Sequence, residues 1–122
     1  MAEFPLCADL PLSGTARAPT CGSTIQLGLA VDSAGGITGV GLRAQACAIG
    51  QAAAAIFVAA ARGKDGREIA ISVADIENWL AGGGLPAWPG FAAIAAARDY
   101  PARHGAVMLA WRAALVALAV PG

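Results

Sequence analysis

The chain has 122 residues, of which 57% are hydrophobic and many are alanine, and its eight basic side chains balance its eight acidic ones. This length is enough for one domain that buries about two-thirds of its unfolded surface without disulfides or a structural metal. Because the charges cancel and no Arg or Lys residues cluster, the sequence argues against binding to nucleic acid or to an anionic membrane.

The cysteines and the first residues bear on the compartment. Three cysteines are an odd number, and MetAlaGluPheProLeu lacks the basic start and apolar core of a signal peptide. We therefore expect reduced thiols in a cytoplasmic protein. Residues 44–61 carry no charge, but they are mostly alanine and include Gln45, Gly50 and Gln51. This composition favours a helix packed on a sheet over a membrane span.

The N-terminal part predicts peripheral structure. Residues 1–12 contain Pro5 and Pro11 and are expected to form an irregular arm or a frayed edge strand. Cys7 lies in this arm, either as a small apolar residue packed on the body or as a third thiol for a site. Residues 13–20 are weakly strand-like, and Pro19 favours an edge position for them.

The next segment predicts a hairpin. Ile25, Leu27, Leu29 and Val31 alternate with small or polar residues, which is the pattern of a half-buried strand. AspSerAlaGlyGly at 32–36 is a turn, and residues 37–45 form the return strand.

Helical patterns follow. One helix is expected from Cys47 to about residue 61, and a shorter one from about Ser72 to residue 80, with Ser72 as its cap. The loop at 82–90 contains Trp88 and is open to three interpretations: a lid, a docking epitope or a linker. Residues 91–96 form one or two turns, and a buried helix runs from Arg103 or His104 to about residue 120.

This order predicts an α+β domain, in which a three-stranded antiparallel β-meander is covered on one face by helices. We expect residues 1–122 to form a single domain, with 1–12 as its N-terminal arm.

Two cysteine motifs carry the candidate chemistry. ThrCysGlySer at 20–23 opens a strand, and AlaCysAlaIleGlyGln at 46–51 opens a helix where the hairpin ends. The fold can thus bring Cys21 and Cys47 together as ligands for a soft metal, and Cys47 would lie where the helix dipole favours negative charge. The alternative is that both are inert, small core residues.

Other chemistries lack their motifs. Asp75 and Glu77 share a short helix without a partner acid, and there is no nucleophile elbow, phosphate-binding glycine loop or zinc-protease motif. Any chemistry therefore belongs to the thiols.

Together these elements resemble the U-type iron–sulfur scaffold family, which comprises IscU, SufU and the N-terminal domain of NifU. The resemblance rests on ProThrCysGly, a hairpin, AlaCysAlaIleGlyGln, and a last helix opened by ProAlaArgHisGlyAla and continued by LeuAlaTrp, and it spans about residues 13–118. It implies a NifU-like domain that assembles a transient iron–sulfur cluster, or a SufU-like zinc-bearing sulfur acceptor.

The resemblance also implies a ligand set. The family's first two cysteines match Cys21 and Cys47, while Ser23 stands where the family has an aspartate. Ala106 stands where the family has its third cysteine, and His104 lies two residues before it. The implied ligands for a cluster, or for a zinc or iron ion, are therefore Cys21, Cys47 and His104, with an open place for a ligand from a second protomer or a partner.

Three functions remain open at this stage. The first is a non-enzymatic scaffold or carrier, whose implied partners are a cysteine desulfurase and acceptor apo-proteins, with a homodimer possible. The second is a sulfur-accepting relay, in which persulfide sulfur passes to Cys47, Cys21 or Cys7 because Ala106 has no thiol. The third is a degenerate module that binds the desulfurase and carries no metal.

Overall fold

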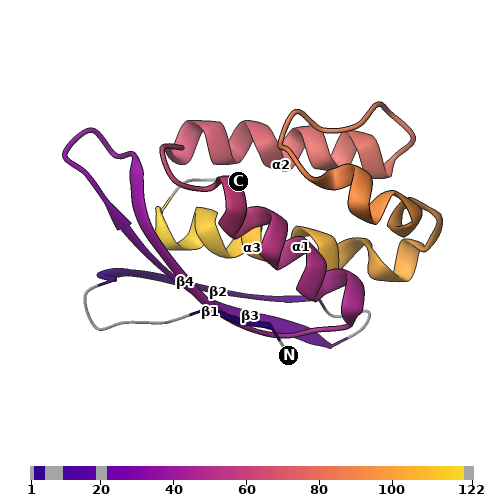
Figure 1. Cartoon of the computed structure of the whole chain (residues 1–122), viewed down its shortest axis with the longest axis horizontal. Coiled ribbons are helices and arrows are strands. Elements are labelled where there is room, and N and C mark those ends of the chain that lie inside the picture. Colours follow the sequence, from indigo (N-terminus) through magenta and orange to yellow (C-terminus); the bar gives the residue numbers. More distant parts are fainter. Residues whose placement is uncertain (1, 5–9, 19–21, 120–122) are drawn as a thin grey trace.

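The computed structural model describes residues 2–4, 10–18 and 22–119. An antiparallel sheet lies on one side of the molecule and the helices on the other (Figure 1). Its strand order is β1-β4-β3-β2, and the strands are β1 (Ala2–Phe4), β2 (Leu12–Ala18), β3 (Ser23–Val31) and β4 (Ile37–Gln45). The predicted α+β fold and its meander of β2, β3 and β4 are confirmed, and β1 adds a short strand beside β4.

The alternation in β3 sets the two faces of the sheet. Ile25, Leu27 and Leu29 are at most 2% exposed and face the helices, while Gln26 lies on the exposed face. The turn into β4 is closed by Asp32, whose carboxylate accepts hydrogen bonds from the backbone N–H groups of Ala34 and Gly36. This contact pairs β3 with β4 in the register that keeps the apolar positions on one face.

The helical elements are α1 (Ala48–Ala60), α2 (Gly66–Leu80), η1 (Phe91–Asp99), η2 (Pro101–Arg103) and α3 (His104–Ala117). The helices α1 and α3 contact the sheet, whereas α2 packs on α3 farther from it (Figure 1). The closest approach is between β2 and α3, where a Cβ at Gly14 would overlap the carbonyl oxygen of Ala113. Only glycine allows the helix to lie this near the strand.

The predicted start of α2 at Ser72 is wrong, because the helix begins at Gly66. Asp65 caps it: the Asp65 carboxylate accepts from the N–H of Glu68, and the Glu68 carboxylate accepts from the N–H of Asp65. This capping box satisfies two backbone donors that would otherwise lack partners. Ser72 lies inside the helix and donates its hydroxyl to the carbonyl oxygen of Glu68.

Trp88 belongs to the core. It is 3% exposed, its indole N–H donates to the carbonyl oxygen of Ile56 at 2.9 Å, and its ring stacks on Phe57 with centroids 5.4 Å apart. Trp111 meets both rings edge-on, and the Lys64 ammonium lies 4.8 Å from the centroid of the Trp88 ring. Trp88 thus anchors the 82–90 loop on α1, which supports a structural interpretation of this loop over a docking epitope.

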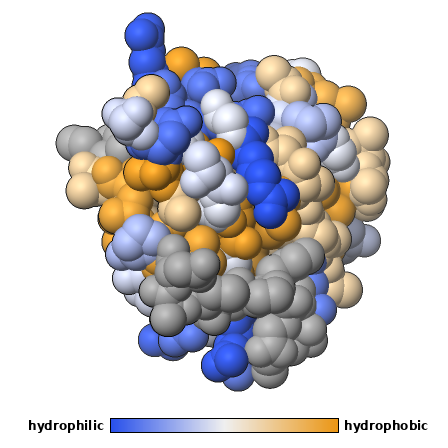
Figure 2. All heavy atoms as spheres, turned by 60° about the vertical axis from the view of Figure 1, so that its left-hand side comes forward, coloured by the Kyte–Doolittle hydropathy of each residue, from blue (hydrophilic) through white to orange (hydrophobic). Residues whose placement is uncertain are grey.

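The surface mixes side chains of both kinds. Seen from the side of the β3–β4 turn, hydrophobic side chains lie between hydrophilic ones (Figure 2). In the part of the chain that the structure describes, no helix is long and apolar enough to cross a membrane. Arg112 lies at the exposed edge of α3, where it pairs with Glu77 of α2 at 3.3 Å.

Candidate functional site

Three segments meet at one end of the sheet. The strand β2 ends at Ala18, which pairs with Ser23 at the start of β3, and the next residue of β3, Thr24, pairs with Gln45 at the end of β4. The N–H of Gly22 donates to the carbonyl oxygen of Ala18 at 2.8 Å, which ties the two ends of the β2–β3 connection together. Cys21 is in this connection and Cys7 in the arm, and both lie outside the described residues.

Cys47 follows β4 at the same end of the sheet. It is the N-cap residue of α1, with φ −63° and ψ 170°, so the helix begins at Ala48, one residue after the predicted start at Cys47. Its side chain makes no hydrogen bond to the helix start and is half-buried. Its carbonyl oxygen accepts a hydrogen bond from the N–H of Gln51 at 2.9 Å, which joins Cys47 to the first turn of α1. The backbone of Cys47 is therefore held at the positive end of the helix dipole, and its free thiol is half-buried there.

The first turn of α3 lies between these two places. A Cβ at Gly50 would lie 3.2 Å from the Cβ of Ala106, so Ala106 contacts α1 one turn after Cys47. A Cβ at Gly105 would lie 3.1 Å from the Cβ of Ala18, so the neighbouring residue contacts the end of β2. The start of α3 thus bridges the helix that begins beside Cys47 and the strand that leads to Cys21.

Ser23 and Ala106 line this end from the inside. Ser23 is 4% exposed and has the same orientation as Ile25 and Leu27, towards the helices. Ala106 is 1% exposed. Neither side chain supplies a thiolate, a carboxylate or an imidazole, so this buried part of the site lacks metal donors.

His104 lies on another side of α3. It is two residues from Ala106, which places the two positions about 200° apart around the helix. His104 lines a cavity of about 300 Å³ between α2 and α3, together with Leu80 and Met108. Its Nε2 lies 3.0 Å from the carbonyl oxygen of Arg98. Because a carbonyl only accepts, Nε2 is the donor in this contact, and Nδ1 of the neutral imidazole is the ring atom left to bind a metal.

The structure therefore brings some of the predicted site residues together and separates others. Cys47 and the Ala106 position share the contact between α1 and α3, whereas His104 is directed into the cavity between α2 and α3. Among the residues with described side chains, no three or more His, Cys, Asp or Glu residues form a group that could hold a metal ion.

The comparisons with known proteins agree with this architecture. Residues 6–107 match the model of the NifU-like N terminal domain, and the chain belongs to this family. No curated protein matches the chain.

Two solved structures share the fold. One is a nitrogen-fixing NifU-like protein (N-terminal) from Brucella abortus, with a TM-score of 0.85 and 24% identity over 93% of this chain and 80% of that chain. The other is an iron–sulfur cluster assembly scaffold protein for the SUF system from Fervidobacterium islandicum AW-1, with a TM-score of 0.82 and 21% identity over 94% of this chain and 85% of that chain.

Proposed function

We propose that this chain is an iron–sulfur cluster assembly scaffold, which holds a transient iron–sulfur unit, or a single iron or zinc ion, as cargo. The observation that carries the proposal is the bridge made by the start of α3, which contacts both Gly50, one turn after Cys47, and Ala18, at the strand end that leads to Cys21. Membership of the NifU-like N terminal domain family supports the same function.

The donors suit cargo that is held and then released. Two thiolates, from Cys21 and Cys47, are ligands that iron and zinc both accept. A closed site needs four donors, and Ala106 removes one of them. The remaining places are open to water or to a ligand from a second protomer or a partner, so the affinity is lower than that of a complete site.

His104 is proposed as a third ligand through Nδ1. In the structure Nε2 donates to the carbonyl oxygen of Arg98, and His104 lines the cavity between α2 and α3. The ring must therefore leave this hydrogen bond and turn towards Ala106 to reach the thiolates. We therefore expect His104 to contribute less to metal affinity than either cysteine.

In this role the protein is a carrier and not an enzyme. Its partners are a cysteine desulfurase, which supplies sulfur, and apo-proteins, which accept the cluster. A homodimer would supply the missing ligand from a second copy. A reducing cytoplasm would keep Cys21 and Cys47 as free thiols.

A sulfur relay is the second candidate, and the free thiol of Cys47 favours it. In this reaction the Cys47 thiolate attacks the outer sulfur of a persulfide on the desulfurase. A new S–S bond forms on Cys47, the old S–S bond breaks, and the desulfurase cysteine leaves as a thiolate, so no external oxidant is needed. A third possibility is a module that binds the desulfurase without carrying metal or sulfur.

Titration with Co²⁺ under anaerobic conditions tests the carrier function. We expect intense thiolate-to-cobalt absorption that saturates near one ion per chain or per dimer. The Cys21→Ala and Cys47→Ala variants should each lose it, His104→Ala should weaken it, and Cys7→Ala serves as the control. Absence of this absorption in the wild type would reject the carrier function, and mass spectrometry after incubation with a desulfurase would then separate the relay, which gains a sulfur atom, from the module, which does not.

A further inference from the structure

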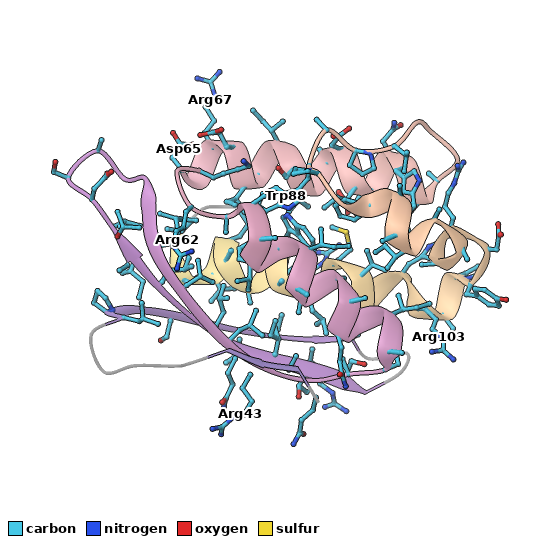
Figure 3. The ribbon with its side chains drawn as sticks, in the orientation of Figure 1. Arg43, Arg62, Asp65, Arg67, Trp88 and Arg103 are labelled. Carbon is cyan, nitrogen blue, oxygen red and sulfur yellow. The ribbon has the colours of Figure 1, made fainter. Side chains whose placement is uncertain are left out.

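The face of the sheet that the helices leave uncovered carries a polar cavity. It has a volume of about 590 Å³. Its polar side chains come from three neighbouring strands and are Thr15, Arg17, Thr24, Gln26, Arg43 and Gln45. Figure 3 shows Arg43 on the side of the sheet opposite the helices.

The strand register arranges these side chains in two rows. One row joins Thr15, Gln26 and Arg43, and the other joins Arg17, Thr24 and Gln45. The two arginines therefore lie on strands that are separated by β3 and are offset by two residues along them, which places their Cα atoms roughly 12 Å apart.

The cavity has a positive character in a protein whose total charge is balanced. Its lining contains two arginines and, among the side chains that the structure describes, no carboxylate. Among the described strand residues, the acidic residue in register with it is Glu3 of β1, opposite Arg43. Arg17 lies on β2, at the other edge of the sheet and away from Glu3. A guanidinium has five N–H donors, so Arg43 can bind a further carboxylate while it keeps the interaction that it already makes.

The cavity is continuous with the thiol end of the molecule. The row that contains Arg17 is followed directly by the pair Ala18 and Ser23, and Gln45 in the same row is two residues before Cys47. A molecule bound here would thus lie beside the end of the sheet where α1 begins.

We propose that this cavity docks an acidic segment of a partner protein, with one carboxylate on Arg17 and another on Arg43. Two acidic side chains of one extended peptide can span the roughly 12 Å between the backbone positions of the arginines, so that each guanidinium binds its own carboxylate. Thr24 and Gln26 lie between the arginines and can bind the peptide backbone of the segment. Such exposed ion pairs are weak and sensitive to salt, so the docking steers and orients the partner and does not hold it permanently.

This docking goes beyond the proposed function, because it uses neither thiol and does not require metal. It can therefore be tested on the metal-free full chain by following the backbone amides by NMR during titration with a glutamate-rich synthetic peptide. We expect shifts concentrated at Thr15, Arg17, Thr24 and Gln26, which disappear when salt is raised. The same peptide with glutamine in place of glutamate should not produce them.

Variants make the test specific. Arg17→Glu combined with Arg43→Glu should weaken peptide binding by about tenfold or more. Arg67→Glu is the matched control, because Arg67 is an exposed arginine on α2 that points away from the sheet (Figure 3), and it should leave binding unchanged. If the double variant fails to fold, Arg17→Gln and Arg43→Gln tested singly should each show part of the loss.

Three outcomes would overturn the proposal. They are shifts that map to another face, equal binding of the glutamine peptide, and equal binding of inorganic phosphate at the same amides. The last outcome would identify a small-anion site in place of a docking surface.

Discussion

Ala106 of α3 lies directly against Gly50 of α1, so that a Cβ added to Gly50 would lie 3.2 Å from the Cβ of Ala106. Gly50 follows the N-cap residue Cys47 by one helical turn. The position implied to carry a third thiol is therefore beside the helix that begins at Cys47, but it presents only a methyl group. Because this position carries a methyl group in place of a thiol, the proposed site lacks one donor.

Restoring that donor should strengthen metal binding. We expect Ala106→Cys to raise the affinity for Co²⁺ by about tenfold or more, because a third thiolate would join the other two. The matched control is Ala110→Cys, which adds a thiol at an equally buried position one turn farther along α3. Both changes add one buried atom and should cost about 1 kcal/mol of stability. Equal Co²⁺ affinities in the two variants would contradict the proposed position of the site.

The capping box makes α2 sensitive to one carboxylate. Replacing Asp65 with alanine removes the acceptor for the N–H of Glu68 and should lower the free energy of unfolding by about 1 kcal/mol. Urea denaturation measures this change. Asp99→Ala is the control, because Asp99 is an exposed acid at the end of η1 and does not cap α2. An equal effect of the two substitutions would rule out a specific role for the cap.

Close packing of α3 on β2 predicts intolerance at Gly14. A methyl group there would overlap the carbonyl oxygen of Ala113, so Gly14→Ala should destabilise the protein by about 3 kcal/mol. At Gly84 an added Cβ meets nothing within 4 Å, and Gly84→Ala should be nearly neutral. Thermal unfolding of the two variants compares them directly, and a stable Gly14→Ala protein would mean that α3 lies farther from the sheet.

Substitutions in the loop that contains Trp88 should affect stability as core substitutions do, because this loop is part of the core and not a lid. Trp88→Phe keeps an aromatic ring but removes the donor to the carbonyl oxygen of Ile56, which should cost about 1 kcal/mol or more. Leu85, in the same loop, is 57% exposed, and Leu85→Ala should change stability by less than about 0.5 kcal/mol. If the two changes had equal effects on urea denaturation, the anchoring role of Trp88 would be wrong.

The strands and most helices could be predicted because their signals are local. In β3 the alternation of Ile25, Leu27 and Leu29 reports directly which side chains are buried. The start of α2 was also encoded locally, since Asp65 and Glu68 have the spacing of a capping box, but the flanking glycines, Gly63 and Gly66, favoured a loop.

The site was less predictable because it depends on contacts between elements. The contact of Ala106 with Gly50 requires the packing of α3 on α1, which no local pattern specifies. Similarly, Arg17 and Arg43 share a cavity only through the pairing of three strands. The position of His104 could not be predicted either, because the direction in which it faces from α3 depends on where the helix begins and how the helix is rotated against its neighbours.

The most direct test of the central claim is the amount of iron and acid-labile sulfide that the purified chain keeps after anaerobic reconstitution and removal of excess reagents. If Cys21 and Cys47 hold the cargo, the wild type and Cys7→Ala should keep comparable amounts, and Cys21→Ala and Cys47→Ala should each lose most of them. Only trace iron in the wild type, or equal iron in the Cys47→Ala variant, would contradict the assignment.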